Sequence, residues 1–226
     1  QGHPLSRYLT GACIEDVNHE IYGGLYSQMI FGESFQEPAP EGISGMWRGV
    51  QRGSAAGSTR LITDTPFKGT QSQRIEFSGG EGAWGIENRG LNRWGMTFTG
   101  DAPYEGVLWA RSETPVTVYA ALEDGEGARV FAEQALEVAP GAWRRVPFVL
   151  TPSGSVEGGR FAIVLKQAGA VDLGYAFLQP GKWGRFKGLP VRRDVAEALV
   201  DEGITVLRYG GSMVNHAEYR WKKMVG

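Results

Sequence analysis

Cysteine is nearly absent from this sequence, since Cys13 is the single example among 226 residues. One thiol excludes a disulfide within the chain and a zinc site built from several cysteines. Long apolar runs are lacking too, because no stretch approaches the roughly 18 residues that span a bilayer. Near the N-terminus, no basic segment precedes a hydrophobic one as it would in a signal peptide. We therefore expect no membrane partner, and the compartment stays open.

The sequence also lacks an excess of charge of either sign. It has 23 basic and 25 acidic residues, which give a formal net charge of -2, and they are scattered along the chain. Proteins that bind nucleic acid concentrate Lys and Arg on one surface to neutralise phosphates. We therefore expect no nucleic-acid partner.

Glycine, by contrast, is abundant. The 34 glycines are about twice the average share of roughly 7%. They accompany 11 Pro, 7 Trp, 8 Tyr and 10 Phe. Turn residues between aromatic-rich segments are typical of short β-strands. The composition therefore predicts a largely β structure.

The beginning of the chain has a different pattern from its middle. Residues 8–14 are mostly apolar and predict a buried strand, which the polar Glu15 and Asp16 follow. Apolar residues then recur at spacings of three and four, which predicts a helix over residues 21–35 with Asn18 as its N-cap. Strand, polar loop and helix form one βα unit.

A second unit lies near the other end. Residues 191–202 place apolar side chains on one side and charged ones on the other, which predicts an amphipathic helix. Gly203 follows at the position expected for a helix C-cap. Residues 204–207 are a compact run rich in β-branched residues, which predicts a strand ending at Arg208. Helix followed by strand is typical of parallel α/β sheets.

Between these units, short strands alternate with glycine-rich breaks at the spacing of an all-β sandwich. We expect strands over residues 73–77, 106–110, 116–122, 143–150, 160–165 and 171–178. The predicted fold class is α/β plus all-β, with residues 1–37 as a first βα unit, 38–184 as an inserted β-sandwich and 185–226 as the continuation of the α/β part.

The predicted α/β part is too small to be complete. Without the sandwich roughly 80 residues remain, whereas a closed (β/α)8 barrel needs about 250. We expect the missing strands to come from a longer protein or from a second chain.

Several motifs carry a resemblance to a known family. CIEDVNH at residues 13–19, YGGLY at 22–26 and VLRYGG at 206–211 resemble the start of the catalytic (β/α)8 barrel of glycoside hydrolase family 51, the α-L-arabinofuranosidases with some endoglucanases. The middle, with QSQRI at 71–75 and GIENRGL at 85–91, resembles the jelly-roll carbohydrate-binding modules of families 4 and 9. Such modules interrupt the barrel at this place in some of these enzymes.

The resemblance implies the N-terminal part of a retaining glycosidase that acts on a plant cell-wall polysaccharide or oligosaccharide. Such an enzyme needs two carboxyl groups about 5 to 5.5 Å apart. In family 51 the acid/base follows an Asn at the end of the fourth barrel strand, and the nucleophile ends the seventh. This chain contains no Asn-Glu dipeptide, so we expect both catalytic carboxylates outside it. The resemblance also implies a homo-oligomer, and it leaves the sugar and the endo or exo mode open.

The same resemblance assigns substrate contacts to the ends of the two flanking strands. Glu15 accepts hydrogen bonds from sugar hydroxyls, and Arg208 orients the nucleophile carboxylate through its planar donors. Ser212 stands where some relatives carry Cys or Asn, and Asn215 lies just beyond it. Without the resemblance, Glu15 equally suits a solvated loop, Arg208 a structural ion pair and Asn215 a polar surface loop.

Aromatic residues of the middle segment are candidates for stacking on sugar rings. In a sandwich, aromatic side chains most often pack in the core, and we expect this for Trp109. Trp84 and Trp94 lie in glycine-rich or polar surroundings and are the candidates for carbohydrate stacking.

No cofactor and no metal are predicted. His19 lies near Glu15 and Asp16 but has no second His nearby to complete a metal site. Structural Ca²⁺ in the sandwich is an open alternative. Two further interpretations of the chain stay open as well. One is a non-catalytic carbohydrate-binding module, and the other is a sandwich that only covers the mouth of a barrel.

Overall fold

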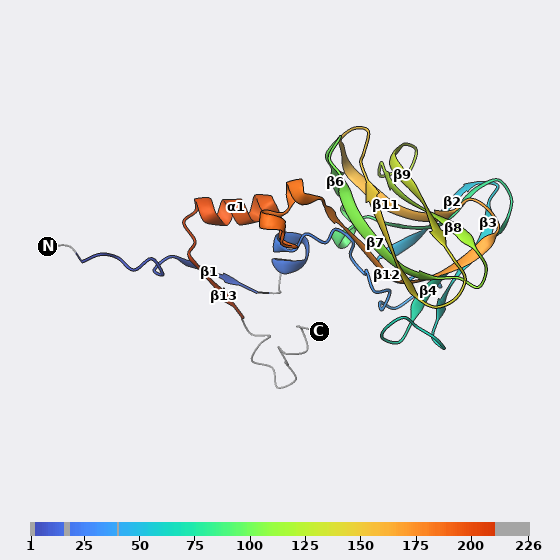
Figure 1. The fold of residues 1–226 in the computed structure, drawn as a ribbon, viewed down its shortest axis with the longest axis horizontal. Coiled ribbons are helices and arrows are strands. Elements are labelled where there is room, and N and C mark those ends of the chain that lie inside the picture. Colours follow the sequence, from blue (N-terminus) through green and yellow to red (C-terminus); the bar gives the residue numbers. More distant parts are fainter. Residues whose placement is uncertain (1–2, 16–18, 40, 211–226) are drawn as a thin grey trace. The chain divides into compact units, whose positions relative to one another are not determined.

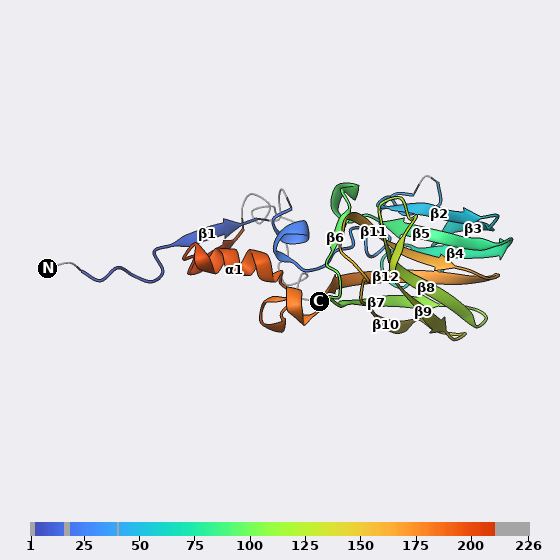
Figure 2. The ribbon, with the colours of Figure 1, turned by 90° about the horizontal axis from the view of Figure 1, so that it is seen from above.

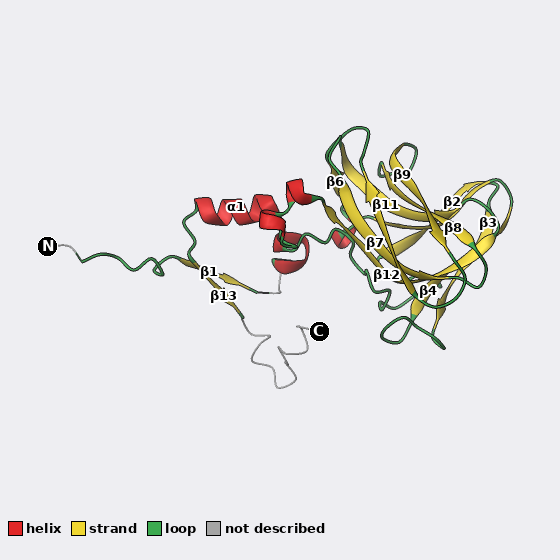
Figure 3. Ribbon diagram, viewed as in Figure 1, coloured by secondary structure: helices red, strands yellow, loops and turns green. Residues whose placement is uncertain are grey.

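The computed structural model describes residues 3–15, 19–39 and 41–210. The chain divides into two compact units, one made of Gln1–Ser27 with Lys182–Gly226 and the other of Gln28–Gly181. Figures 1 and 3 show that the Gln28–Gly181 unit consists almost entirely of strands and loops, while helix α1 belongs to the first unit. The all-β middle unit begins at Gln28, ten residues before the predicted position 38.

The unit Gln28–Gly181 is built from two antiparallel sheets (Figure 2). The five-stranded sheet, in spatial order, contains β10 (Arg144–Leu150), β7 (Tyr104–Arg111), β12 (Gly169–Pro180), β4 (Ser72–Gly79) and β3 (Ala56–Ile62). The six-stranded sheet contains β2 (Trp47–Gly53), β5 (Gly82–Asn88), β11 (Val156–Leu165), β8 (Val116–Glu123) and β9 (Val130–Val138), with β6 (Met96–Phe98) paired to β11.

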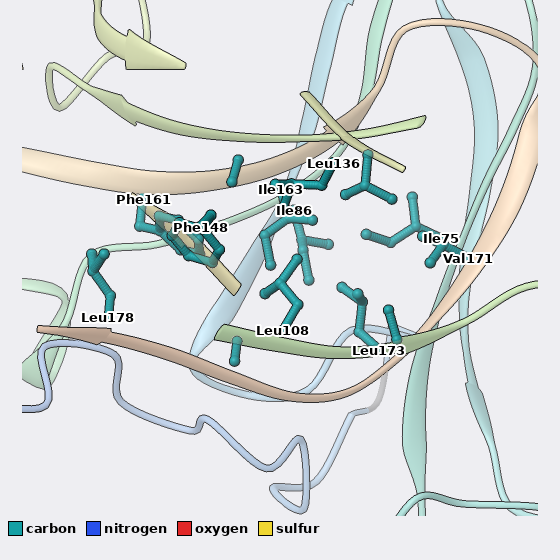
Figure 4. Close-up of a cluster of buried hydrophobic side chains, with 14 of the residues drawn as sticks. Ile75, Ile86, Leu108, Leu136, Phe148, Phe161, Ile163, Val171, Leu173 and Leu178 are labelled. Carbon is teal, nitrogen blue, oxygen red and sulfur yellow. The ribbon is translucent and has the colours of Figure 1, made fainter. Parts of the chain in front are cut away.

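One hydrophobic core fills the space between the two sheets (Figure 4). Ile86 from the six-stranded sheet and Leu108 from the five-stranded sheet are both fully buried in it. Phe148 of β10 stacks on Phe161 of β11, with 5.7 Å between ring centroids. Side chains of alternate residues enter this core, as the period of two in a strand requires. The structure is therefore mostly β-sheet, as the composition predicts.

Each strand predicted in the middle segment is present, with shifted ends. The pattern did not single out β2, β3, β5, β6 and β9. β9 shows why, because its sequence VFAEQALEV is rich in Ala, Glu and Leu, which favour helices. Its pairing with β8 along the whole of its length overrides that local preference.

The helix predicted over residues 21–35 is wrong beyond its first turn. Ile21–Leu25 forms one π-helical turn (η1), and Tyr26 is extended with ψ 134. Further along, Ile30 and Phe35 are fully buried in the core of the sandwich. From Met29 onward, the apolar residues that predicted a helical stripe thus serve the sandwich core instead.

Residues 28–37 cross the sandwich without regular secondary structure, and hydrogen bonds from side-chain amides fix their position. Asn88 is fully buried; its Nδ2 donates to the carbonyl of Phe31 at 2.8 Å, and its Oδ1 accepts from the N–H of Gly90 at 2.9 Å. Gln28 Oε1 accepts a backbone N–H of β12 at 2.9 Å. Leaving a buried backbone group unpaired costs roughly 1–3 kcal/mol, so these amides fix the path of the segment.

Asn88→Ala tests this role. The substitution leaves the Phe31 carbonyl and the Gly90 N–H without their side-chain partner, and we expect the free energy of unfolding to fall by about 2–4 kcal/mol. Urea unfolding measures the change. The exposed amide Gln167 supplies the control Gln167→Ala, which should change stability by less than about 0.5 kcal/mol. Equal effects of the two variants would contradict the assigned role.

Glu33 lies in the same segment and makes stability depend on pH. Burial raises the pKa of its carboxyl group, with a smaller contribution from the negative charge of Glu37. A raised folded-state pKa means that folding favours the protonated form of Glu33. The contribution of Glu33 to the free energy of unfolding is therefore present at low pH and is lost as pH rises through the folded-state pKa.

Glu33→Gln should therefore stabilise the protein at pH 7 and leave its stability unchanged at about pH 3.5, below the unfolded pKa of roughly 4.3. Denaturant unfolding at both pH values measures the difference, with the exposed Glu126→Gln as control. A stabilisation that is the same at both pH values would overturn the electrostatic explanation.

The other unit contains a two-stranded parallel sheet and several helical turns. Strand β1 (Gly11–Ile14) pairs with β13 (Val206–Tyr209) in a register that sets Cys13 opposite Arg208. Besides η1, the helical elements of this unit are η3 (Lys182–Gly184), η4 (Phe186–Gly188) and α1 (Arg193–Asp201). No helix in the described part of the chain has both the length and the apolar character to cross a membrane.

Helix α1 ends as the sequence predicts. Gly203 has φ 71, and its N–H bonds to the carbonyl of Val200 at 2.9 Å, while the N–H of Ile204 reaches the carbonyl of Leu199 at 3.0 Å. These two bonds form a Schellman motif, which favours glycine at the left-handed position. The chain leaves the helix there and continues directly into β13.

The parallel sheet is exposed, contrary to the buried strand predicted for residues 8–14. All four residues of β13 are exposed, with Leu207 at 52% and Tyr209 at 46%. Parallel strands in proteins are normally covered on both faces. Within the described residues, the strands of this sheet are therefore less covered than parallel strands usually are.

Candidate functional site

Two of the predicted site residues, Glu15 and Arg208, lie at the same edge of the parallel sheet. Glu15 directly follows β1, which ends at Ile14, and Arg208 is the third residue of β13. Because the two strands run in the same direction, their carboxyl ends meet at one edge. The register sets Cys13 opposite Arg208, so Glu15 lies two residues beyond that pair at the same edge of the sheet.

Cys13 connects these two charged groups. Arg208 Nη1 donates to Cys13 Sγ at 3.0 Å, and Cys13 Sγ donates to Glu15 Oε1 at 3.5 Å. A thiol can accept and donate weakly at once, so one sulfur links both partners. From the sequence, Cys13 excluded a disulfide and a multi-cysteine zinc site and opened the CIEDVNH motif, but it was not expected to contact Glu15 or Arg208. The signal that was missed is the spacing of two between Cys13 and Glu15, which sets both side chains toward the same face of an extended chain.

Glu20 fixes the backbone of the loop that carries Glu15. Its Oε2 accepts the N–H of Glu15 at 2.7 Å, and its backbone carbonyl accepts the N–H of Leu25 at 2.9 Å within η1. The π-helical turn, which stands where a longer helix was expected, thus brings the Glu20 carboxylate within hydrogen-bond distance of the Glu15 N–H. Glu20 positions Glu15 without using up the side-chain oxygens of Glu15.

This arrangement suits recognition of hydroxyl groups or of a second carboxylate. The Glu15 carboxylate accepts hydrogen bonds only, whereas the Arg208 guanidinium donates only and presents several donors in one plane. Ser212 and Asn215 lie outside the described residues, as do Asp16 and Asn18. Their predicted roles therefore stay predictions.

The tryptophans of the sandwich have different environments. Trp94 follows η2 (Leu91–Arg93) and is 74% exposed. Trp84 is half-buried and covers Gly57, where an added Cβ would lie 2.6 Å from its Cδ1 atom; its Nε1 donates to the carbonyl of Ser58 at 3.3 Å. Sugar stacking by Trp84 and Trp94 stays a prediction.

The expectation that Trp109 packs in the core is wrong. Along β7, buried and partly exposed residues alternate, and Trp109 belongs to the partly exposed set on the outer face of the sheet. Its ring stacks on Phe67, with 4.7 Å between centroids. Together with Tyr175 and Phe177 it lines a groove of about 420 Å³. Strand alternation would have revealed this, since Leu108 is a core residue and its neighbour must face outward.

Within the described part of the chain, no cluster of three or more His, Cys, Asp or Glu residues suits a metal ion. The structure therefore adds no support for the calcium alternative.

Comparisons with known proteins place this geometry in context. No protein-family model matches the chain. The chain is 24% identical over 242 residues to an extracellular exo-alpha-L-arabinofuranosidase of Streptomyces chartreusis, covering 100% of this chain and 28% of the relative. It is 23% identical over 238 residues to alpha-L-arabinofuranosidase 2 of Arabidopsis thaliana, covering 98% of this chain and 35% of that protein.

A solved structure has the same fold. The chain superposes with a TM-score of 0.85 on an arabinose-bound α-L-arabinofuranosidase of glycoside hydrolase family 51, at 23% identity, over 99% of this chain and 38% of the other. The resemblance to family 51 carried by the terminal motifs is thereby confirmed. This chain spans between 28% and 38% of the length of these proteins.

Proposed function

We propose that this chain is the N-terminal part of a retaining glycoside hydrolase that releases arabinofuranose from plant cell-wall polysaccharide. The observation that carries the proposal is the linked pair Glu15 and Arg208 at the carboxyl edge of a parallel sheet. Support comes from three curated relatives that match nearly all of the chain and are named arabinofuranosidases. Their names favour this activity over the endoglucanase alternative.

In this proposal, β1 and β13 are the first two strands of a (β/α)8 barrel, and the sandwich is a jelly roll inserted between them. Each strand of a closed barrel has a neighbour on both sides, whereas β1 and β13 pair only with each other in the described part of the chain. The exposed Leu207 and Tyr209 suit a sheet that further strands and helices cover. The rest of the protein, or a second chain, supplies those strands.

The site residues take complementary roles in the assembled barrel. Glu15 accepts hydrogen bonds from hydroxyls of the arabinofuranosyl unit, and Arg208 orients the nucleophile carboxylate and favours its charged form. Ser212 and Asn215 add substrate contacts. The nucleophile and the acid/base come from strands beyond this chain. No metal or cofactor takes part in this chemistry, which needs only two carboxyl groups.

The alternative function, carbohydrate binding without catalysis, draws support from one observation. The outer face of the five-stranded sheet carries grooves with aromatic and polar linings, and both kinds of side chain contact sugars. This role is compatible with the enzyme, because a binding surface keeps a polymeric substrate near the catalytic site.

Hydrolysis of 4-nitrophenyl α-L-arabinofuranoside tests the enzyme proposal. We expect the full-length protein to cleave it and the present chain alone to be inert. In the full-length protein, Glu15→Gln and Arg208→Ala should each lower kcat/KM by about 100-fold, because each removes a charge-assisted hydrogen bond in the site. The exposed Glu202→Gln is the control. Hydrolysis by this chain alone would contradict the placement of the catalytic carboxylates.

Cys13 is a positioning residue in this scheme, and two substitutions isolate its role. Cys13→Ser keeps a group that donates and accepts, so kcat/KM should stay within about twofold of the native value. Cys13→Val is of similar size but breaks the link between Glu15 and Arg208, and we expect a loss of about tenfold. Steady-state kinetics on the full-length enzyme measures both. Equal losses would mean that Cys13 acts only through packing.

A further inference from the structure

Arg192, the residue that precedes helix α1, contacts the π-helical turn η1 that Glu20 precedes. It is extended, with φ −61 and ψ 125, and it belongs to the same compact unit as η1. In the sequence, Arg192 lies 169 positions after its hydrogen-bond partner Gly23, on the other side of the inserted sandwich. The proposed hydrolysis assigns no role to Arg192 or to its neighbour Asp194.

The backbone of Arg192 is fixed by hydrogen bonds of the main chain. Its N–H donates to the carbonyl of Leu25, the last residue of η1, at 2.8 Å. The preceding residue, Val191, accepts the N–H of Phe186 at 2.9 Å through its carbonyl. Neither bond involves the Arg192 side chain, so substitution of that side chain leaves both bonds in place.

The Arg192 side chain makes a second contact with the same turn. Its Nη1 donates to the carbonyl of Gly23 at 3.2 Å. Its other nitrogens pair with the carboxylate of Asp194, with 3.1 Å between Nε and Oδ1 and a second bond from Nη2 to Oδ2. The hydrogen bond from Arg192 lowers the pKa of Asp194, so this carboxylate stays charged at neutral pH. A planar guanidinium that is fixed at two points has its remaining donors oriented.

Two glycines let η1 present these carbonyls. Gly23 has φ 85 and ψ −11, a left-handed conformation that glycine adopts without strain. At Gly24, an added Cβ would lie 2.7 Å from the carbonyl oxygen of His19, which is closer than real contacts allow. The conformation of the turn, and with it the direction of the Gly23 carbonyl, therefore depends on both glycines.

The turn connects Arg192 to Glu15. The N–H of Leu25 donates to the carbonyl of Glu20 at 2.9 Å, and Glu20 Oε2 accepts the N–H of Glu15 at 2.7 Å. Arg192 thus bonds to the last residues of η1, while the residue at its beginning bonds to the Glu15 backbone. An unbroken series of contacts runs from the Asp194 carboxylate through Arg192 and η1 to Glu15.

We propose that Arg192 is a positioning residue of the candidate site: its guanidinium, oriented by Asp194, fixes η1 so that Glu20 keeps Glu15 in place. The effect on catalysis rests on the proposed function, in which Glu15 accepts hydrogen bonds from the arabinofuranosyl unit. A displacement of about 1 Å in such a group can cost as much as 100-fold in rate. Arg192 also joins the part of the unit that precedes the sandwich to the part that follows it.

Steady-state kinetics of the full-length enzyme with 4-nitrophenyl α-L-arabinofuranoside tests the proposal. Arg192→Met keeps much of the aliphatic stem but removes every side-chain donor, and we expect kcat/KM to fall about tenfold. Arg192→Lys keeps one charge without the planar fork and should lose about threefold. Arg193→Met is the matched control, because Arg193 also pairs with a carboxylate, Glu197, at 2.7 Å but bonds to no residue of η1 in the described part of the chain. It should stay within about twofold.

A double-mutant cycle separates positioning from a general effect on the fold. In an enzyme that already carries Glu15→Ala, Arg192→Met should lower kcat/KM by less than about twofold, because the group that Arg192 positions is gone. A purely structural role would give the same loss with and without Glu15, and such additivity would overturn the proposal. If Arg192→Met does not fold, Arg192→Lys takes its place in the cycle.

Amide hydrogen exchange of the full-length protein measures the position of η1 without any need for catalysis. Arg192→Met should raise the exchange rates of the Glu15 and Leu25 N–H groups at least about fivefold, because both bond to Glu20 and local opening sets their exchange. Arg193→Met should leave both rates unchanged. Unchanged exchange in Arg192→Met would show that Arg192 does not fix the turn.

The two measurements distinguish the positioning role from the proposed function. If the native full-length protein does not cleave the aryl arabinofuranoside, the proposed function fails, and a rise in exchange still supports the contact of Arg192 with η1. If the native enzyme cleaves it and Arg192→Met raises exchange without lowering kcat/KM, catalysis does not depend on this contact. That result overturns the positioning role and leaves the proposed hydrolysis intact.

Discussion

The parallel pairing of β1 with β13 is the interaction on which the candidate site depends. It joins residues 11–14 to residues 206–209, and closing so long a loop is costly unless the intervening chain is folded with its ends together. The sandwich meets that condition, because the N–H of Met29 near its beginning bonds to the carbonyl of Leu178 near its end at 2.8 Å. A unit with adjacent ends can interrupt another fold at little cost.

The sandwich contains two buried carboxylates, one on each sheet, whose charge is compensated in the same way. Asp172 on one sheet and Glu123 on the other are both buried carboxylates, and each lies between two arginines. Such pairing compensates for the loss of hydration. Only Asp172 combines this pairing with a polar groove and with an oxygen that lacks a hydrogen bond among the described residues.

The sequence predicted the parts of the site that sit in motifs and missed those that depend on register. Glu15 follows β1 and Arg208 lies within β13, so their position at one edge of a parallel sheet was predictable. Cys13 entered the site only because pairing sets it opposite Arg208. Trp109 was expected in the core, yet the position of β7 in the sheet turns it outward. Side-chain type alone does not decide which face of a strand a residue occupies.

Local pattern was sufficient for six strands of the sandwich, namely β4, β7, β8, β10, β11 and β12, and for the α1 helix with its Gly203 cap. These features rest on hydrophobic period and backbone conformation, which neighbouring residues determine. Tertiary structure decided three other features: the irregular conformation of residues 26–35, the hydrogen bonds of Cys13 Sγ, and the grooves of the five-stranded sheet. Their energies come from partners far away in sequence, such as Asn88 for Phe31 and Asp172 for Arg74, and no short window of sequence contains both partners.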